Sequence, residues 1–302
     1  MKYLITGGTG LVGQKLTKLL LANNHTVSIL SRSERRDTEV SYFKWDVKND
    51  YVDPEALEGV DCVIHLAGAG IADEKWTDER KNEIIESRVK PLLLLAKGFK
   101  AVGTFPKAMV SASAIGIYGF DTGETELNED SQKGKDYISE VVIKWEKAVD
   151  DFAKQTGCRS VKLRIGIVLD ADGGALPSMA LPVKLGVGSA IGDGQQWLSW
   201  IHVNDLTSMF LAASENEVME GAFNAVGPSP ARNQSMVNTL GKVLKRPIWA
   251  PKVPGFVLKA MLGSRAQLVL GGNKVSSEKI LDTGFTFEFD NLEAALSEIY
   301  NS

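Results

Sequence analysis

The sequence predicts an α/β fold in which helices cover both faces of a parallel sheet. Three observations lead to this prediction. Apolar, β-branched segments alternate with longer amphipathic segments through the first half of the chain. A short apolar segment, residues 2–6, runs directly into a glycine-rich turn and then into a helical pattern. The chain has 302 residues, which exceeds the usual size of a single core and predicts a smaller attached region.

The expected elements alternate in chain order. We expect strands at residues 2–6, 26–31, 41–45, 61–66, 107–113 and 160–167. We expect helices at residues 11–22, 53–58, 78–101 and 136–156. Pro91 should kink the third helix or mark a close packing contact. Residues 197–203 have strand character, Asn204 and Asp205 can cap the helix that follows, and residues 223–226 predict another strand.

The character of the sequence changes after Val168, where glycines interrupt short apolar segments. We therefore expect residues 1–170 to form the large domain, with residues 197–226 returning to it. Residues 171–196 and 227–302 should form a smaller region, and the pattern from Asn233 onward is mostly helical. This region should lie over the carboxyl edge of the sheet, where open α/β sheets bind their ligands.

The turn after the first strand carries a phosphate-binding pattern. Gly8, Gly10 and Gly13 form G-x-G-x-x-G, and Gly7 adds G-x-x-G-x-x-G. Gly7 or Gly8 would permit the tight turn, and Gly10 would let bare backbone approach a pyrophosphate. Gly13 would let the helix lie close to the sheet. The alternative is a purely structural glycine turn. The strand before the turn and the helix after it favour dinucleotide binding over this alternative.

The pattern therefore predicts a Rossmann-type dinucleotide site. The helix that begins at Leu11 would direct its free N–H groups and its positive dipole end at the pyrophosphate. A P-loop does not fit, because Gln14 and Lys15 stand where that motif requires Gly-Lys-Ser/Thr. The predicted phosphate-binding residues are Gly7, Gly8, Thr9, Gly10, Leu11, Val12 and Gly13.

The end of the second strand predicts which coenzyme binds. NAD enzymes place an acidic residue there for the ribose 2′-hydroxyl. This chain has Ser31 and Arg32 instead, with Arg35 and Arg36 close behind. A guanidinium offers a 2′-phosphate a planar fork of donors, whereas a carboxylate would repel it. We therefore predict NADP(H), bound mainly by Arg32 with Ser31 beside it. The alternative is that residues 31–37 are only a solvated charged loop.

Composition and charge exclude several other classes. A net charge of −4 leaves no basic surface for nucleic acid, and no apolar run is long enough to span a membrane. The N-terminus enters a strand without a signal peptide, and the two isolated cysteines are typical of a reducing compartment, so we expect a cytoplasmic protein. The three histidines lack ligand spacing, so we expect no metal site.

Motifs spread along the whole chain resemble those of the extended short-chain dehydrogenases/reductases. The sequence is most similar to the atypical branch of epimerase-family proteins, which are related to NAD(P)-dependent epimerases and dehydratases and have their own C-terminal domain. The motifs are Thr6–Gly13, Leu66-Ala67-Gly68, Lys75-Trp76, Ser87-Arg88, Ser111–Gly119, Trp145-Glu146, Leu163–Leu169, Ser199–His202, Lys245-Arg246-Pro247 and Thr283-Gly284-Phe285.

The resemblance implies further cofactor contacts. It implies that Asp46 contacts the adenine, and that Leu66, Ala67 and Gly68 line the ribose and nicotinamide side. Arg88 stands where relatives usually have an active-site Asn, and it is expected to face the cofactor together with Glu83 on the preceding turn. The alternatives are that Asp46 caps a turn, that Leu66 and Ala67 belong to the core, and that Arg88 is an ordinary surface residue.

The resemblance also implies a catalytic Tyr, which exchanges a proton with a substrate oxygen, and a Ser that holds this oxygen. A Tyr is a poor base at neutral pH unless a cation stabilises its phenolate, and in relatives a Lys four residues later does so. Tyr137 stands at the expected helix start, but Val141 occupies the Lys position. Ser113 is the predicted Ser, with Ser111 as the alternative. Arg88, Lys135 or Lys144 could supply the missing cation, and Tyr137 could instead serve only in packing.

Two functions are therefore open. The first is an NADP(H)-dependent oxidoreductase or epimerase acting on a small molecule, such as a nucleotide sugar or another carbonyl compound. In that case residues 186–200, including Gln195 and Trp197, would surround the substrate. The second is a non-catalytic NADP(H)-binding redox sensor or interaction module, which Val141 favours. By family analogy alone, the chain could form a homodimer through the helices at 78–101 and 136–156.

Overall fold

The computed structural model describes residues 1–33 and 35–301. Within these residues, an eight-stranded sheet has the strand order β12-β8-β6-β5-β1-β2-β3-β4. All neighbouring pairs are parallel except β3 and β4 at one edge. The strands are β1 (Lys2–Thr6), β2 (Thr26–Ser31), β3 (Val40–Asp46), β4 (Tyr51–Val52), β5 (Cys62–His65), β6 (Ala108–Ala114), β8 (Arg159–Ile165) and β12 (Gly221–Ala225).

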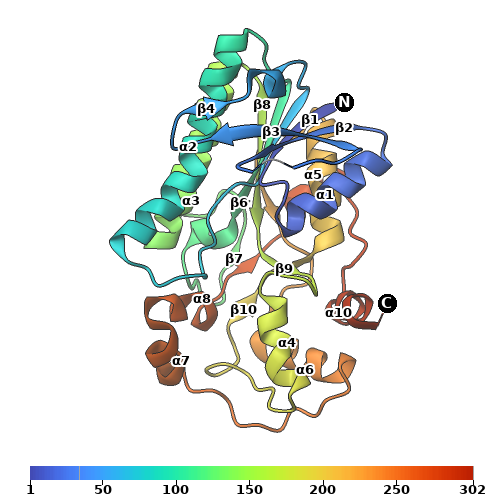
Figure 1. The fold of residues 1–302 in the computed structure, drawn as a ribbon. Helices are drawn as coiled ribbons and strands as arrows, with labels where there is room; N and C mark the ends of the chain where they lie inside the picture. The colour runs from blue at the N-terminus through green and yellow to red at the C-terminus, as the bar shows by residue number, and fades with distance from the viewer. Residues whose placement is uncertain (34, 302) are drawn as a thin grey trace.

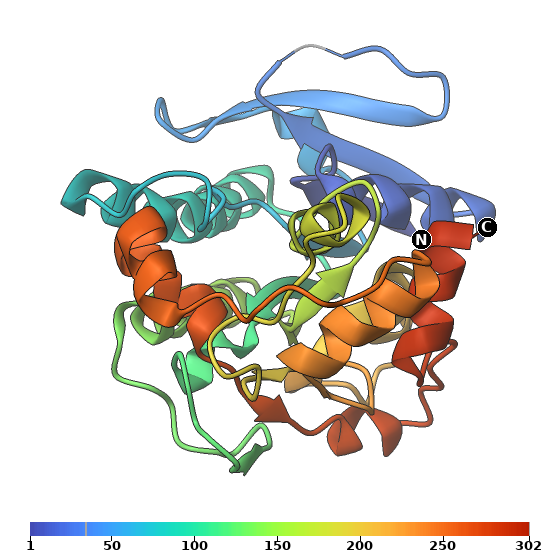
Figure 2. The ribbon, with the colours of Figure 1, turned by 90° about the horizontal axis from the view of Figure 1, so that it is seen from below.

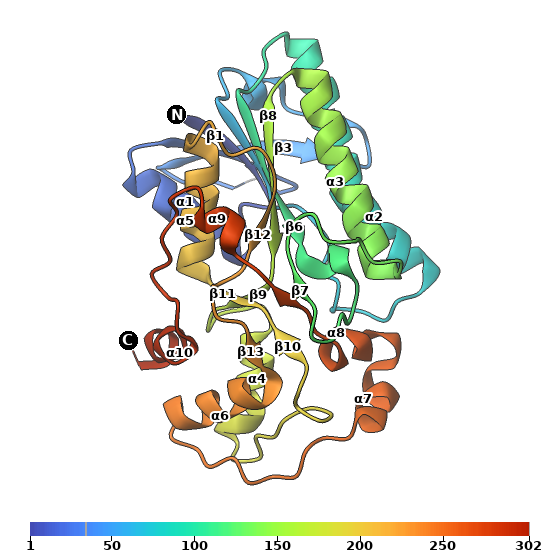
Figure 3. The same ribbon diagram turned by 180° about the vertical axis from the view of Figure 1, so that it is seen from behind.

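Helices cover both faces of this sheet, as Figures 1 and 3 show from opposite sides. One face carries α2 (Asp78–Val102) and α3 (Tyr137–Thr156), and the other carries α1 (Leu11–Ala22) and α5 (Val203–Glu215). The apolar strands and the inner faces of these helices form one large core. The predicted doubly wound α/β fold is therefore confirmed.

The chain order reverses at β1. From β1 the chain continues to β2 and β3 on one side, and then crosses to β5, β6, β8 and β12 on the other. Open α/β sheets bind ligands outside the carboxyl ends of the strands at such a point. The loops that follow β1 and β5 meet there, and they contain the predicted glycine turn and residues 66–68.

A smaller group of elements lies below this carboxyl edge (Figure 1) and surrounds it in the view from below (Figure 2). Its helices are α4 (Leu176–Lys184), α6 (Asn233–Val243), α7 (Gly255–Leu262) and α8 (Gln267–Leu270), with the 3₁₀ turn η3 (Gly263–Ala266). Short strand pairs tie it together: β10 (Trp197–Leu198) with β13 (Ala231–Arg232), and β9 (Ile167–Leu169) with β11 (Trp200–His202). A second core fills the space between α4, α6 and α10 (Leu292–Asn301).

The remaining elements are short. These are the 3₁₀ turns η1 (Pro54–Leu57) and η2 (Ile115–Tyr118), the pair β7 (Glu126–Leu127) and β14 (Lys274–Val275), and α9 (Glu278–Leu281). The C-terminal tail does not stay in the small region, because Ile280 is buried in the large core. The predicted boundary at residue 227 therefore does not separate the two cores completely.

Local predictions differ from the structure at three places. The expected helix at 53–58 is only the 3₁₀ turn η1, whereas Pro91 is buried inside α2, in agreement with the close-packing alternative for that residue. The expected strand at 197–203 is divided between two small sheets. The prediction that Asn204 and Asp205 cap α5 is wrong. His202 is the N-cap and accepts from the Asn204 N–H, whereas the Asp205 carboxylate accepts from the backbone N–H groups of residues 288 and 289.

Candidate functional site

The turn between β1 and α1 is shaped by contacts that only glycine permits. Gly7 has φ +71°, and a Cβ there would lie 2.7 Å from the carbonyl carbon of Leu66 and 2.8 Å from the nitrogen of Ala67. Gly8 has no positive φ, but a Cβ there would lie 2.8 Å from Cδ1 of Ile29. Of the two glycines considered for the tight turn, Gly7 is the one with the left-handed backbone that a side chain disfavours.

The two later glycines have different surroundings. A Cβ on Gly13 would lie 2.5 Å from the Gly7 carbonyl oxygen, so this glycine lets α1 pack against the turn. A Cβ on Gly10 would meet only the Gly7 oxygen, at 3.4 Å, and Gly10 is exposed. Gly10 is the N-cap of α1 without a side-chain hydrogen bond to the helix. The first N–H groups of α1 therefore face outward beside bare backbone, which is the arrangement that binds a pyrophosphate.

A buried hydrogen-bond chain joins this turn to the loop after β5. His65 lies fully buried, with Nδ1 2.7 Å from the Thr6 hydroxyl and Nε2 3.2 Å from the Arg88 carbonyl oxygen. Because a carbonyl only accepts, Nε2 carries the proton and Nδ1 accepts from Thr6. The Thr6 oxygen in turn accepts from the Ala67 N–H at 3.3 Å. Burial lowers the pKa of His65 to about 4, so the ring is neutral. Apart from the place of His65 at the end of a buried strand, no pattern in the sequence indicates this role.

The predicted 2′-phosphate contacts lie at the end of β2. Ser31 is buried, and its hydroxyl oxygen accepts from the Ser33 N–H at 3.3 Å. Arg32 is exposed. Within residues 1–33 and 35–301, no carboxylate lies within ion-pairing distance of its guanidinium. Arg32 therefore presents its donors to solvent beside the glycine turn.

Asp46 and Glu83 both have partners within the protein. One Asp46 oxygen accepts from the backbone N–H groups of Lys48 and Asn49, and the other from the Asn49 side chain at 2.7 Å. These bonds lower the pKa of Asp46 and correspond to the turn-capping alternative. Glu83 accepts from Arg80 Nη1 at 2.8 Å on an exposed face of α2. Contacts of either residue with a cofactor stay predictions.

Tyr137, Arg88 and Gly68 lie together where α2 and α3 pack at the carboxyl edge. The Tyr137 hydroxyl donates to the Lys81 carbonyl at 3.2 Å, and its ring packs edge-on against Trp76. Arg88 is half-buried, with its guanidinium carbon 5.1 Å from the Trp145 ring centroid. A Cβ on Gly68 would lie 3.1 Å from that guanidinium carbon. Arg88 is thus not an ordinary surface residue. Burial raises the pKa of Tyr137, and the positive charge of Arg88 opposes this effect.

Ser113 has a hydrogen-bond partner within the protein. Its hydroxyl donates to the Glu146 carboxylate at 2.7 Å, and both side chains are buried. The alternative, Ser111, donates to the Ala112 carbonyl. A hydroxyl that already donates its only proton can accept from a substrate but cannot also donate. The structure therefore does not bring Ser113 and Tyr137 into one hydrogen-bonded pair, and the substrate role of Ser113 stays a prediction.

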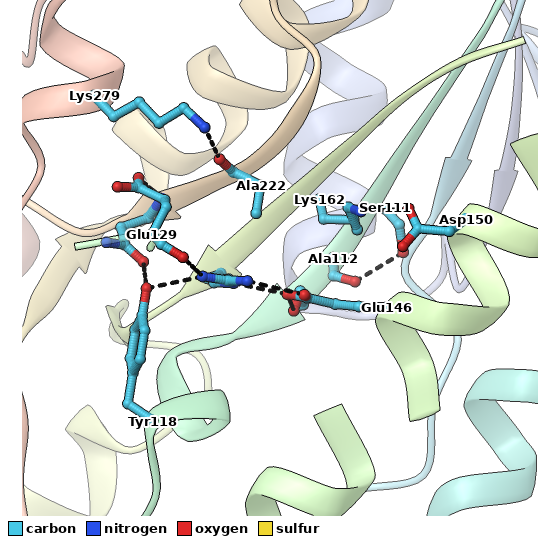
Figure 4. Close-up of polar contacts among 12 residues, drawn as sticks. Ser111, Ala112, Tyr118, Glu129, Glu146, Asp150, Lys162, Ala222 and Lys279 are labelled. Atoms are coloured by element: carbon cyan, nitrogen blue, oxygen red, sulfur yellow. Dashed lines mark hydrogen bonds and ion pairs between the residues drawn. The ribbon is translucent and has the colours of Figure 1, made fainter. Parts of the chain in front are cut away.

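Glu146 belongs to a buried network, drawn in Figure 4. Arg164 donates through Nε and Nη2 to the two Glu146 oxygens at 2.8 and 3.0 Å. Its Nη1 donates to the Tyr118 hydroxyl and to the Glu129 carbonyl. The Tyr118 hydroxyl donates to Asn224 in β12 at 2.7 Å. The Arg164 charge and these bonds hold the pKa of Glu146 below its usual value despite burial. Tyr118 is thus part of the core.

The position of the missing Lys is inside the core. Val141 is buried in α3 and offers no charge to Tyr137. Lys144, one of the candidate replacements, forms an exposed ion pair with Glu140 at 2.6 Å. Arg88 is the candidate replacement whose charge acts on Tyr137.

The predicted substrate residues also contact the protein. The Trp197 indole N–H donates to Glu124 at 3.3 Å, and Arg232 lies 3.6 Å from the Trp197 ring centroid. Gln195 has an exposed side chain, and its carbonyl accepts from Arg232. These contacts tie the loop between α4 and α5 to β13 and to the segment before β7.

Comparison with known proteins then identifies the family. The model of the NAD-dependent epimerase/dehydratase family matches residues 3–226. The chain belongs to this family. A domain of unknown function matches residues 253–299. An epimerase family protein of Staphylococcus aureus is 36% identical over 302 residues, which cover 99% of this chain and 98% of the relative. The predicted resemblance to epimerase-family short-chain dehydrogenases/reductases is therefore confirmed.

Two solved structures resemble this epimerase-family chain over its whole length. The human epimerase family protein SDR39U1 (isoform 2), crystallised with NADPH, is 34% identical with a TM-score of 0.88, and the match covers 100% of both chains. A nucleoside-diphosphate sugar epimerase of Corynebacterium glutamicum is 31% identical with a TM-score of 0.80, and the match covers 100% of this chain and 59% of that one. In the part of the chain that the structure describes, no helix is long and apolar enough to cross a membrane.

Proposed function

We propose that the chain is an NADP(H)-dependent oxidoreductase or epimerase that acts on a hydroxyl or carbonyl group of a small molecule. One observation carries the proposal: the outward-facing N–H groups of α1 and the exposed Arg32 side chain lie at the chain reversal of the sheet. The human relative, whose crystal structure contains NADPH, supports the choice of coenzyme.

Each part of the coenzyme has residues that would hold it. The turn from Gly7 to Gly13 would hold the pyrophosphate, and Arg32 and Ser31 the 2′-phosphate. Asp46 would approach the adenine from the end of β3, while residues 66–68 and Arg88 would line the nicotinamide side, with Glu83 nearby. The bound coenzyme supplies or accepts hydride at the substrate carbon.

Tyr137 would exchange a proton with the substrate oxygen. Its hydroxyl now donates to the Lys81 carbonyl, so this bond must be replaced by one to the substrate. Since Ser113 donates to Glu146, it would receive a hydrogen bond from a substrate hydroxyl. The Trp76 ring packs against both Tyr137 and Phe120. These rings would exclude water from the proton transfer.

The substrate would enter from the side of the small region. The loop with Gln195 and Trp197 would border it, with the exposed Gln195 side chain as a polar contact. The name of the Corynebacterium glutamicum relative favours a nucleotide sugar, and another carbonyl compound is the alternative within the same reaction class.

A second function has a specific observation in its favour. Both predicted catalytic hydroxyls, those of Ser113 and Tyr137, already donate within the protein, and Val141 gives Tyr137 no cation. A chain that binds NADP(H) without turnover, as a redox sensor or interaction module, would need no free hydroxyl.

Turnover separates the two functions. NADPH consumption would be followed with carbonyl compounds, and epimer formation with nucleotide sugars. The wild type would be compared with Tyr137→Phe. An enzyme with Tyr137 as its acid should turn over at least one substrate, and Tyr137→Phe should lower kcat by about 100-fold or more. Equal rates for both proteins would refute the role of Tyr137. Binding of NADPH without any turnover would support the sensor.

We further propose a homodimer through the outer faces of α2 and α3, where Leu93 is half exposed. Light scattering should then give twice the mass of 32.8 kDa, and a mass of one chain would contradict this.

Cys62 and Cys158 are free thiols, which suits a reducing compartment such as the cytoplasm.

A further inference from the structure

We propose that Arg88 is the cation that stabilises the phenolate of Tyr137. Arg88 lies in α2, whereas Tyr137 lies in α3. Arg88 would thus be an electrostatic positioning residue for the proton transfer. This inference rests on the proposed function, in which Tyr137 exchanges a proton with the substrate.

Two hydrogen bonds to the same helix bring the groups together. The Tyr137 hydroxyl donates to the Lys81 carbonyl at 3.2 Å, and Arg88 Nη1 donates to the Ile84 carbonyl at 2.8 Å. These carbonyls are three residues apart in α2, which is about 4.5 Å along the helix axis. The phenol oxygen and the guanidinium are therefore neighbours at the same end of the α2–α3 contact.

Packing fixes the guanidinium in this place. It lies over the ring of Trp145 from α3, and Gly68 packs so closely on it that a Cβ there would lie only 3.1 Å from its carbon. Its bond to the carbonyl four residues earlier points the side chain back along α2 toward Lys81. A charge that is held by packing and partly shielded from water acts more strongly on a neighbour than an exposed one.

The other charges around Tyr137 are balanced by opposite charges. Arg80 is within 4.0 Å of the carboxylates of Asp73, Glu74 and Glu83. Lys81 is 3.8 Å from Asp78, and its Nζ is 5.5 Å from the centre of the Tyr137 ring.

On α3 itself, Glu140 pairs with Lys144 and disfavours the phenolate. Among the described residues, no carboxylate lies within ion-pairing distance of Arg88. Burial lowers the pKa of Arg88 to about 10, so it is still a cation at neutral pH. Its charge is thus available to the phenolate.

The position of Arg88 matters for the transfer of the Tyr137 proton. When the Tyr137 O–H bond breaks and its proton forms an O–H bond with a substrate oxygen, negative charge appears on the phenolate oxygen. A fixed guanidinium nearby stabilises that charge. In the reverse direction it keeps the phenolate available to take the proton from a substrate hydroxyl.

The test is a titration of Tyr137 that needs neither coenzyme nor substrate. Protein labelled with ¹³C at the tyrosine ζ carbon would be titrated by NMR above pH 8, and Tyr137→Phe would identify the signal among the six tyrosines. The variants would be Arg88→Met, Arg88→Gln and Arg88→Lys. Lys81→Met is the matched control, because the Lys81 ammonium is also a cation beside the ring.

Arg88→Met and Arg88→Gln should raise the Tyr137 midpoint by about one pH unit, a tenfold loss of phenolate at a given pH. Arg88→Lys and Lys81→Met should change the midpoint by only a few tenths of a unit. If Arg88→Met does not fold, Arg88→Gln serves, since it can keep the bond to the Ile84 carbonyl. An unchanged midpoint in the neutral variants would overturn the proposal, as would an equal shift in Lys81→Met.

The result is separable from the proposed function. Failure of the protein to bind NADPH would refute the proposed function. A shift of the Tyr137 midpoint in the Arg88 variants would still support the link between Arg88 and Tyr137. If the wild type turns over substrate but the Tyr137 midpoint is unchanged in the Arg88 variants, only the role of Arg88 is refuted.

Discussion

The two ends of the candidate site are built differently. The coenzyme end, around Gly7 and Gly13, is backbone packed against backbone, with separations that exclude even a methyl group. The reactive end, around Ser113 and Tyr137, depends on side chains that find partners far along the chain: Glu146 is 33 residues from Ser113, and Lys81 is 56 residues from Tyr137. The first end is held by close packing of backbone on backbone, whereas the second depends on charge pairing and hydrogen bonds.

The reactive end can therefore vary in sequence more readily than the coenzyme end. Backbone contacts admit few sequences, so the glycine turn marks the family. The partners of a catalytic hydroxyl can change one residue at a time, and here Arg88 and Val141 stand where relatives are expected to have other residues. The predictions below probe the two ends in turn, beginning with the largest effect.

Removal of Glu146 should have the largest effect on stability. Its side chain and that of Arg164 are 6% and 5% exposed, so Glu146→Ala leaves a buried guanidinium without its carboxylate. We expect a loss of about 3–5 kcal/mol in the free energy of unfolding, measured by urea denaturation. Glu140→Ala is the control, because it breaks an exposed pair with Lys144 and should cost less than about 0.5 kcal/mol. Equal losses would show that the buried network does not hold the reactive end together.

At the coenzyme end, Gly7→Ala should cost about 3 kcal/mol, because it combines a positive φ with overlap on the Leu66 backbone. Gly10→Ala is the contrasting variant. Its new Cβ meets only one atom at 3.4 Å, so stability should change by less than about 1 kcal/mol, while NADPH affinity should fall because the methyl group covers the pyrophosphate face. Denaturation and coenzyme titration of both variants check this. Full NADPH affinity in Gly10→Ala would place the pyrophosphate elsewhere.

His65 joins the two ends and should make stability depend on pH. Its folded pKa is about 4, well below the unfolded value of 6.5, so the unfolded chain binds the proton more tightly. Stability from this group is complete above pH 6.5, and up to about 3 kcal/mol is lost as the pH falls to 4. His65→Gln should flatten the stability curve in this interval. A slope that is the same in wild type and variant would show that His65 does not titrate as inferred.

The smallest effect is expected at Trp145. Its indole N–H is buried without a hydrogen-bond partner among the described residues, so Trp145→Phe removes a group that contributes little. We expect a loss of no more than about 1 kcal/mol, from packing against Arg88. A loss of several kcal/mol in the same urea series would indicate that the N–H has a partner after all.

The sequence was sufficient to predict the fold and the glycine turn. Both depend on local patterns: apolar strands that alternate with amphipathic helices, and glycines that a turn and a close helix require. The sequence also left Gly7 and Gly8 as alternatives, which only the backbone angle at Gly7 distinguishes. Short strands such as β7 and β14 escaped prediction because their pairing partners are distant along the chain.

The side-chain partners of the reactive end could not be predicted for the same reason. Nothing near Ser113 indicates that its hydroxyl bonds to Glu146, and nothing near Asp46 distinguishes a turn cap from an adenine contact. The buried role of His65 depends on Thr6, 59 residues away. Such pairings follow from the three-dimensional register of β1, β5 and α2, which periodicity alone does not fix.

The most direct test of the account is calorimetric titration of the wild type and of Arg32→Glu with NADPH and with NADH. The account predicts that the wild type binds NADPH more tightly, and that Arg32→Glu loses about 2–3 kcal/mol of NADPH binding while NADH binding is kept or improved. Binding heat with neither coenzyme, or tighter binding of NADH by the wild type, would contradict it.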